Sequence, residues 1–339
     1  MQTPIVITEQ EFEKGKDLFT SYPQYKWQVS TPSEASVAEA IRRTGARIAV
    51  LGTTRYAGPL YDALAENGKG KPALIVRYGV GFDGIDVGQC KSKGIFLCIT
   101  PGALDESVAE HTIALLLSLA QNIPFCHGEF LQGRFTRLTG FELAGKTLGL
   151  VGFGNIAKRV AEIASRGLGM QVKAFGRTPL EQKAAEEGLP PEKYLSQYHL
   201  AGYYTDFPAF AKDLQILSLH LPVTPQTTRF LDKNRIASLP RGTYLVNTGR
   251  GRLVDEGALY EALASGHLAG AALDVFTHEP YVPESEDKDL RKLGNVVLTP
   301  HIASDTRESN RNMQESILRN IEAFLSGEFD KLTEAPAGA

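Results

Sequence analysis

The sequence predicts an α/β protein with parallel sheets and about two domains. Short aliphatic runs such as Ile48 to Leu51 and Ala73 to Val76 alternate with helical stretches such as Ser33 to Arg43, which is the pattern of strands joined by crossover helices. The length of 339 residues gives ample room for buried cores. The longest apolar stretch, Thr112 to Ala120, is too short to span a bilayer. We therefore expect an α/β protein without a membrane-spanning helix.

The composition excludes several classes of function. A net charge of −3 gives no general attraction to nucleic acids or membrane surfaces. The N-terminus enters a strand pattern directly, without the cationic and apolar regions of a signal peptide. The three cysteines, Cys90, Cys98 and Cys126, match no metal-site spacing, and an odd count fits a reducing cytosol. We expect a cytoplasmic protein with no nucleic-acid, membrane or metal partner.

The first set of strands is expected in the N-terminal part of the chain. Strand patterns occur at Ile5 to Ile7, Ile48 to Leu51, Ala73 to Val76 and Ile95 to Ile99. The amphipathic pattern from Arg307 to Leu325 predicts a final helix with no sheet of its own to cover, so it should return to this N-terminal unit. The polar tail from Asp330 to Ala339 is expected to be disordered.

A second set of strands begins with a strand, a glycine-rich turn and a helix. Thr147 to Val151 is an apolar run typical of a buried strand, and the helical pattern starts at Asn155. Gly152 permits the turn, and Gly154 lets the backbone approach a pyrophosphate. The N–H groups of Asn155 and Ile156 open a helix whose positive end favours that anion. The pattern predicts a dinucleotide site, the alternative being a glycine turn in an α/β domain without a ligand.

The choice of dinucleotide is predicted from the end of the next strand, Gln171 to Phe175. An acidic residue at this position would bind the ribose 2′-hydroxyl of NAD. The chain has Gly176, Arg177 and Thr178 there instead, which removes the repulsion of a 2′-phosphate and supplies a guanidinium to bind it. NADP(H) is therefore favoured as the cofactor, and NAD(H) is the alternative if Arg177 points only to solvent.

Several motifs give the chain a family resemblance. They read RYGVGFDGIDV, TPGALDESVAEHTIALLL, LVGFGNIAKRVA, LHLPVTPQT, NTGRGRLVDEGAL, GAALDVFTHEP and LTPHIAS. With these motifs the chain resembles the D-isomer-specific 2-hydroxyacid dehydrogenases. The resemblance implies a Rossmann-type doubly wound cofactor domain, residues 104–303, inserted in a flavodoxin-like substrate domain formed by residues 1–103 and 304–339. It also implies an active-site cleft between the domains and a homodimer through the cofactor domain.

The same resemblance implies a catalytic trio of Arg250, Glu279 and His301. A guanidinium can hold a substrate carboxylate or carbonyl oxygen with directed donors. An imidazole can donate a proton to the carbonyl oxygen as hydride arrives, and a neighbouring carboxylate favours the imidazolium form. The structural alternatives are a loop salt bridge for Arg250, a turn beside a proline for Glu279 and a core histidine for His301.

Further site residues follow from the resemblance. The backbone amides of Gly79, Val80 and Gly81 match the substrate-carboxylate cradle, with Arg77 either adding charge there or pairing with an acid at the surface. Residues expected to line the cofactor are Leu221, Pro222, Thr248, Gly249, Asp274 and Ala303. His111, His220 and His278 are expected to be structural.

The expected function is reversible hydride transfer between NAD(P)H and a small 2-keto acid, as in glyoxylate and hydroxypyruvate reductases. One alternative is a D-3-phosphoglycerate dehydrogenase, although Leu51 and Gly52 stand where those enzymes tend to carry an arginine for the phosphate. The other is an NAD(H)-sensing corepressor-like binding protein. The segment from Lys183 to Tyr204 is longer than usual in this family and has no functional interpretation from the sequence.

Overall fold

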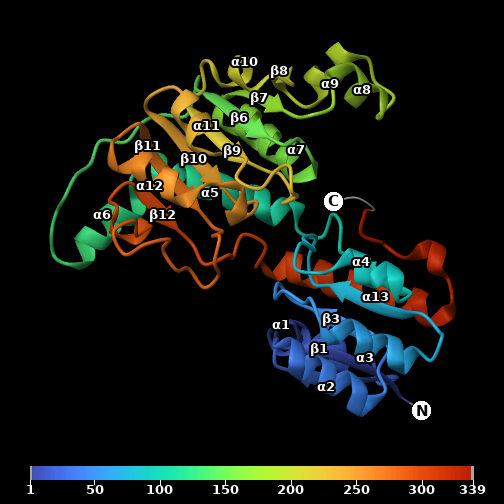
Figure 1. Cartoon of the computed structure of the whole chain (residues 1–339). Helices are drawn as coiled ribbons and strands as arrows, with labels where there is room; N and C mark the ends of the chain where they lie inside the picture. Colours follow the sequence, from blue (N-terminus) through green and yellow to red (C-terminus); the bar gives the residue numbers. More distant parts are fainter. Residues whose placement is uncertain (1, 337–339) are drawn as a thin grey trace. The chain divides into compact units, whose positions relative to one another are not determined.

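The computed structural model describes residues 2–336, which fall into two compact units (Figure 1). Of the described residues, the first unit comprises 2–104 and 305–336, and the second comprises 105–304. Each contains one parallel sheet, so the predicted α/β class is confirmed. The assignment of the two units to substrate and cofactor stays a prediction.

The first unit contains a five-stranded sheet in the order β2-β1-β3-β4-β5, which is the flavodoxin-like order. Its strands are β1 (Thr3–Thr8), β2 (Tyr25–Ser30), β3 (Ile48–Leu51), β4 (Ala73–Arg77) and β5 (Ile95–Cys98). Its longer helices are α1 (Glu9–Thr20), α2 (Glu34–Thr44), α3 (Pro59–Gly68), α4 (Val87–Ser92) and α13 (Arg307–Ser326). β3 and β4 are buried along their whole length, which explains their continuous aliphatic runs.

The final helix α13 returns to the first unit, as the sequence predicts. The Thr306 side chain caps its first turn by accepting from the Ser309 N–H, and Gly327, at φ 75°, ends it in the left-handed conformation. Inside the unit, the Gln314 side chain donates to the Lys14 carbonyl at 2.9 Å and to the Tyr78 hydroxyl at 3.0 Å. These bonds join α13 to α1 and to the residue that follows β4, both far away in the sequence.

The prediction of a disordered tail is wrong for residues 330–336. The Ile99 N–H donates to the Thr333 carbonyl, and the Ala335 N–H donates to the Leu97 carbonyl. Asn320 on α13 also accepts the Thr333 N–H at 2.9 Å. The polar composition of this segment gives no sign of these bonds. Their partners are in or near β5 and on α13, outside the segment, so the segment's own sequence does not predict them. Residues 337–339 of the predicted tail lie outside the described residues.

The second unit contains a seven-stranded sheet in the order β12-β11-β10-β9-β6-β7-β8. Numbered from β6 this is the Rossmann order with one added strand. The strands are β6 (Thr147–Val151), β7 (Gln171–Phe175), β8 (Leu200–Tyr204), β9 (Ile216–Leu219), β10 (Thr243–Asn247), β11 (Leu268–Leu273) and β12 (Val296–Leu298). The longer helices are α5 (Asp105–Ala120), α6 (Ile123–Leu131), α7 (Asn155–Glu162) and α12 (Glu256–Ala264). None of the helices in the described part of the chain is long and apolar enough to cross a membrane.

The unexplained segment from Lys183 to Tyr204 builds one edge of this sheet. It contains the second half of α8 (Leu180–Ala185), then α9 (Pro191–Gln197) and the edge strand β8. Tyr194 on α9 is fully buried, and its ring lies edge-on to that of Phe153 in the glycine-rich turn, at 6.3 Å. The segment therefore packs aromatic side chains against the turn that is predicted to bind the cofactor.

Candidate active site

Glu279 and His301 meet at the carboxyl edge of the second sheet. Glu279 follows β11 and His301 follows β12, and these parallel strands are neighbours. The His301 Nδ1 lies 2.6 Å from Glu279 Oε2, and Glu279 Oε1 accepts the Phe276 N–H at 3.0 Å. Because Nδ1 is bonded to the carboxylate, Nε2 is the nitrogen that can exchange a proton with another molecule. The two side chains stay 28% and 33% exposed, so a ligand can reach them.

His301 is held in an unusual backbone conformation. Its φ is 54°, which is uncommon for a residue other than glycine and persists where the surroundings enforce it. The His301 N–H donates to the Asp274 carbonyl at 2.8 Å. The Asp274 carboxylate accepts the next two N–H groups of the loop, those of Ile302 and Ala303, each at 2.9 Å. Asp274 thus fixes the loop that carries His301.

Asp274 is fully buried and remains a carboxylate. Burial alone would raise its pKa, but hydrogen bonds from His111, Thr299, Ile302 and Ala303 outweigh burial and hold the pKa below its usual value. The Thr299 hydroxyl donates to Asp274 Oδ1 at 2.6 Å, and His111 Nε2 lies 3.2 Å from that hydroxyl oxygen. His111 therefore belongs to the network beneath the site, a position that its place in the sequence did not indicate.

We expect Asp274→Asn to lower both stability and kcat. Asparagine has one acceptor oxygen, so its amide group would face one of the N–H groups that Asp274 now accepts, leaving a buried donor unpaired. The free energy of unfolding at pH 7, measured in urea, should fall by roughly 1–3 kcal/mol. The difference from wild type should shrink in acid, because a group with a depressed pKa stabilises above its unfolded pKa and loses this effect as the pH falls through the folded one.

The control for this substitution is Asp213→Asn, which alters a carboxylate that pairs with Lys173 and is 58% exposed. It should change stability by less than about 0.5 kcal/mol. If Asp274→Asn matched this control in both stability and kcat, Asp274 would not position the His301 loop.

Arg250 lies in a loop that is pressed against the Asp274–Glu279 segment. A Cβ on Gly251 would come within 1.9 Å of the Phe276 carbonyl carbon, so only glycine permits this approach. The Asn247 side chain donates to the Arg250 carbonyl at 2.9 Å, which fixes the loop at the end of β10. The residues of the NTGRG motif before and after the arginine therefore set its position beside the segment that carries Glu279.

The glycine-rich turn has the features that a dinucleotide needs. Gly152 has φ 87°, and a Cβ there would be 2.6 Å from the His220 carbonyl oxygen. Gly154 precedes α7, and a Cβ there would meet no atom within 4 Å, which leaves open space in front of the helix N-terminus. The Asn155 side chain hydrogen-bonds Asp105, whose pKa is raised by burial. Ile156 packs its side chain on the core, so only its backbone can serve a ligand.

The other candidate cofactor residues lie at the ends of strands in the same sheet. Thr248 is buried, and its hydroxyl lies 2.8 Å from that of Thr112. The Gly249 N–H donates to the Asn247 side chain at 3.0 Å. Leu221 approaches Gly152 with its side chain, and the Pro222 carbonyl accepts the Thr227 hydroxyl. Their contact with a cofactor stays a prediction.

The candidate substrate loop lies in the first unit, after β4. Gly79 has φ 135°, a conformation that only glycine adopts readily. None of the backbone hydrogen bonds recorded for residues 2–336 uses the N–H groups of Gly79, Val80 or Gly81. Arg77 is buried and donates to the carbonyls of Gly81, at 2.9 Å, and Leu51, at 2.8 Å. Arg77 therefore braces this loop, and its contact with substrate stays a prediction.

A residue that the sequence did not single out, Glu11, lies beside this region. A Cβ at Gly52 would lie 2.2 Å from Glu11 Oε1. Thr8 joins the two segments, since its hydroxyl donates to Glu11 and accepts the Gly52 N–H at 3.2 Å. A carboxylate thus stands where a phosphate-binding arginine would be expected in a phosphoglycerate dehydrogenase, which disfavours a phosphorylated substrate.

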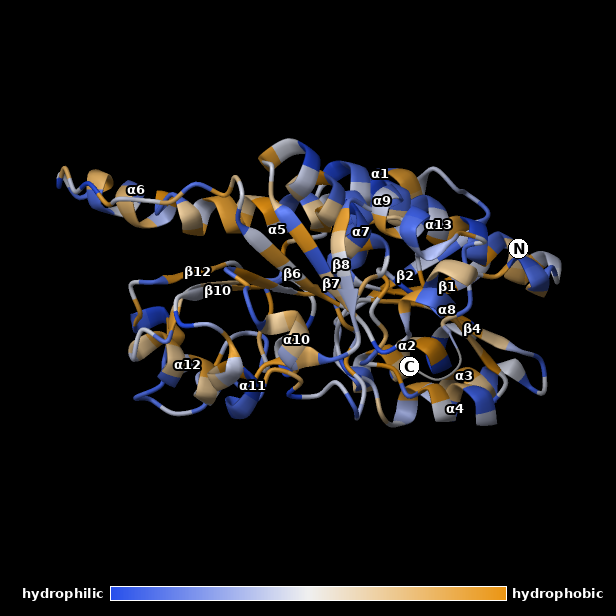
Figure 2. Cartoon of the chain, turned by 90° about the horizontal axis from the view of Figure 1, so that it is seen from above, coloured by the Kyte–Doolittle hydropathy of each residue, from blue (hydrophilic) through white to orange (hydrophobic). Residues whose placement is uncertain are grey.

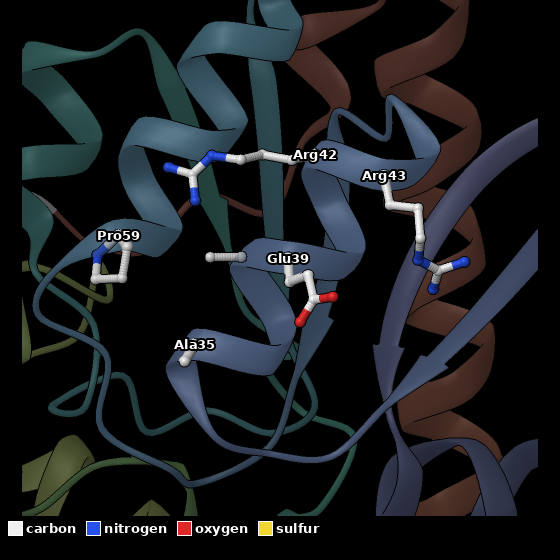
Figure 3. A pocket seen from close by; sticks show the side chains of 6 residues that line it. Ala35, Glu39, Arg42, Arg43 and Pro59 are labelled. Atoms are coloured by element: carbon white, nitrogen blue, oxygen red, sulfur yellow. The ribbon is translucent and has the colours of Figure 1, made fainter.

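The remaining candidates lack the features of a site. His220 bonds Ser218 at 2.9 Å, and burial lowers its pKa to about 4, so it is neutral at pH 7. Between α2 and α3 a surface pocket is lined by Ala35, Ala38, Glu39, Arg42, Arg43 and Pro59 (Figure 3). None of these is a predicted site residue. Within residues 2–336 no group of three or more His, Cys, Asp or Glu side chains could hold a metal ion.

A family model and a curated relative match this chain and point to the same protein family. Residues 113–303 match the family model described as "D-isomer specific 2-hydroxyacid dehydrogenase, NAD binding domain". A glyoxylate reductase from Thermococcus litoralis is 33% identical over 99% of this chain and 100% of its own length.

Two solved structures resemble the whole fold, each with a TM-score of 0.79. One is the NADPH-dependent glyoxylate/hydroxypyruvate reductase from Sinorhizobium meliloti in complex with NADP and malonate, 28% identical over 96% of this chain and 94% of that one. The other is the D-lactate dehydrogenase from Aquifex aeolicus with NAD and lactic acid, 26% identical over 96% of both chains.

Proposed function

Because the chain belongs to the D-isomer specific 2-hydroxyacid dehydrogenase family, we propose that it reduces small 2-keto acids of the glyoxylate and hydroxypyruvate type to 2-hydroxy acids. The observation that carries this proposal is the 2.6 Å contact between Glu279 and His301, with the His301 loop fixed by Asp274. The relatives named glyoxylate reductase and glyoxylate/hydroxypyruvate reductase support the substrate class. The carboxylate of Glu11 beside Gly52 favours these acids over a phosphorylated one.

The roles of the residues follow from their chemistry. Gly152, Gly154 and the N-terminus of α7 would hold a nicotinamide cofactor, which would supply or accept the hydride. Arg250 binds the substrate carboxylate or carbonyl oxygen and orients the carbon for attack. His301 donates its Nε2 proton to the carbonyl oxygen in reduction and takes a proton from the hydroxyl in oxidation. Glu279 stabilises the imidazolium on which the donation depends.

The proposal is tested by mixing the protein with NADPH or NADH and a panel of 2-keto acids. We expect loss of nicotinamide absorbance with glyoxylate and hydroxypyruvate, and a lower kcat/KM with 3-phosphohydroxypyruvate. Binding of both nucleotides with no turnover of any keto acid would instead favour the corepressor-like alternative.

We further propose that NADPH is the preferred cofactor. Arg177 lies two residues after the end of β7 and is exposed. Its guanidinium can take a 2′-phosphate through paired charge-assisted bonds, and the Thr178 hydroxyl adds a donor. The absence of an acidic residue at Gly176 removes the repulsion that a 2′-phosphate would otherwise meet.

Arg177→Ala should lower kcat/KM for NADPH by roughly 10- to 100-fold, because it removes charge-assisted bonds worth about 1.5–3 kcal/mol. With NADH the value should stay within about twofold of wild type. The control is Arg166→Ala, which removes a guanidinium that is 65% exposed and lies before β7 in the sequence. A higher kcat/KM with NADH in the wild-type protein would contradict the preference.

We also propose that the chain forms a homodimer through the segment that contains α6. This segment leaves the end of α5 and extends away from the second sheet, and several of its residues are coloured as hydrophobic in Figure 2. Exposed large hydrophobic residues gather on it, namely Ile123, Phe125, Phe130, Leu131, Phe135 and Leu138. Burial against the same segment of a second copy would remove this apolar surface from water and form a two-fold symmetric contact.

The variant Phe130→Asp with Phe135→Asp should convert the dimer to a monomer, since each aromatic anchor contributes on the order of 2 kcal/mol to such contacts. Light scattering after gel filtration measures the mass against 36.9 kDa for one chain. Val282→Asp, which changes an apolar residue that is 59% exposed outside this segment, should stay dimeric. A monomeric wild type, or a dimeric double variant, would contradict the proposed interface.

The proposed compartment is the cytoplasm. Cys90, Cys98 and Cys126 are all free, as expected of thiols in a reducing environment.

A further inference from the structure

Gly176 lies directly against the hydroxyl group of Tyr203. A Cβ at residue 176 would be 2.2 Å from the Tyr203 Oη and 3.1 Å from its Cζ. Both contacts are closer than a carbon atom can approach without movement of the ring. The phenol of Tyr203 therefore occupies the space into which a side chain at residue 176 would extend.

The ring of Tyr203 is held by its strand and by two neighbouring rings. On β8, Tyr203 is paired with Ala174 of β7, two residues before Gly176 and on the same face of the sheet. The ring lies nearly perpendicular to those of Phe153, at 6.4 Å, and Tyr194, at 6.5 Å. Both neighbours are buried, and Phe153 belongs to the glycine-rich turn. The hydroxyl is thus fixed at the carboxyl edge, between that turn and the loop that begins at Gly176.

The chemistry of a phenol at this place is opposite to that of an acid. A carboxylate at the end of the second strand accepts a bond from the ribose 2′-hydroxyl and repels a 2′-phosphate. Burial raises the pKa of Tyr203, so the phenol is uncharged and keeps its proton at neutral pH. It can then donate to an anionic oxygen, which makes the stronger, charge-assisted kind of hydrogen bond.

We propose that Tyr203 is a specificity-determining residue for the adenosine end of the cofactor. Its hydroxyl donates to the 2′-phosphate whose charge is bound by Arg177, and its ring excludes an acidic side chain at residue 176. The inference rests on the proposed preference for NADPH and assigns a role to the segment between Lys183 and Tyr204. α9 and β8 from that segment supply Tyr194 and Tyr203, which pack on Phe153.

The test separates this inference from the preference itself by using fragments of the cofactor. Calorimetric titration of the full chain with 2′,5′-ADP and with 5′-AMP reports binding of the 2′-phosphate without turnover. Tyr203→Phe keeps the ring and its packing. It should weaken binding of 2′,5′-ADP about tenfold, the usual effect of losing a hydrogen bond to a charged group, and leave 5′-AMP within about twofold.

Tyr198→Phe is the matched control. Tyr198 belongs to the same aromatic cluster, but its hydroxyl bonds Lys158 at 3.2 Å and also Glu187. Its removal should leave the ratio of the two affinities unchanged. If Arg177→Ala abolishes the preference for 2′,5′-ADP and Tyr203→Phe does not change it, the role of Tyr203 is wrong and the preference stands. Equal wild-type binding of the two fragments would overturn both.

The exclusion of an acid is tested by a double-mutant cycle on thermal unfolding. Gly176→Asp in the wild-type background should lower Tm by at least about 4 °C, because the new Cβ meets the phenol. In a Tyr203→Ala background the same substitution should cost much less and should reverse the preference toward 5′-AMP. Additive changes in Tm would show that residues 176 and 203 do not compete for the same space.

Discussion

Replacing His301 by alanine is expected to lower kcat for keto-acid reduction by roughly 10²–10⁴-fold, the usual contribution of a general acid. The imidazole is bonded through Nδ1 to Glu279 and is partly exposed, so its loss removes the proton donor without changing the glycine-rich turn. NADPH binding, measured by fluorescence titration, should stay near wild type. His278→Ala is the control, because His278 is exposed and adjacent to Glu279 in the sequence.

Glu279→Gln tests whether proton transfer by His301 depends on the negative charge of Glu279 or only on the hydrogen bond between the two side chains. The amide still offers one oxygen to a hydrogen bond but no longer favours the imidazolium electrostatically. Reduction requires the imidazolium, so kcat for keto-acid reduction should fall by at least about tenfold, while NADPH binding stays near wild type. Near-normal kcat in His301→Ala would remove the histidine from the mechanism, and a wild-type kcat in Glu279→Gln would make the glutamate structural.

The sequence predicted most clearly the elements whose pattern is local. β3 and β6 have the bounds expected from their apolar runs, because parallel strands buried on both faces are nearly continuously apolar. The tail after Asp330 was predicted wrongly because its order depends on bonds from Thr333 to Asn320 and Ile99. Such long-range contacts leave no periodicity in a short polar segment.

In the candidate site, too, the sequence predicted features that depend on local motifs but not those that depend on contacts between distant residues. The sequence motifs placed Glu279 and His301 after strands, where the structure has them. The position of Asp274 at the end of a strand also made it a candidate site residue. The sequence could not show that the Asp274 carboxylate accepts bonds from the His301 loop. It also could not show that Tyr203 reaches Gly176, because that contact depends on the register between β7 and β8.

Arg250→Ala is expected to lower kcat/KM by about 10³-fold, with most of the loss in the step that follows cofactor binding. A guanidinium directed at the substrate's carboxylate or carbonyl oxygen contributes binding, orientation and stabilisation of developing charge, and the loss of one such group commonly costs 10²–10³-fold. The Gly251 backbone rests on Phe276, so the arginine keeps a fixed relation to the segment that carries Glu279. A small shift of this loop would therefore change the position of the guanidinium relative to the substrate and lower kcat.

Arg250→Lys tests whether charge alone is sufficient. A lysine keeps the positive charge but lacks the planar fork that binds a carboxylate through two parallel bonds, so it should recover no more than about tenfold of the lost kcat/KM. Arg252→Ala is the control, since Arg252 is exposed two residues later in the same loop and should leave kcat/KM within about twofold. Full activity in Arg250→Lys would mean that the site needs only a positive potential. Full activity in Arg250→Ala would remove the residue from the substrate site, and the backbone amides of Gly79, Val80 and Gly81 would then be the substrate-carboxylate site to test next.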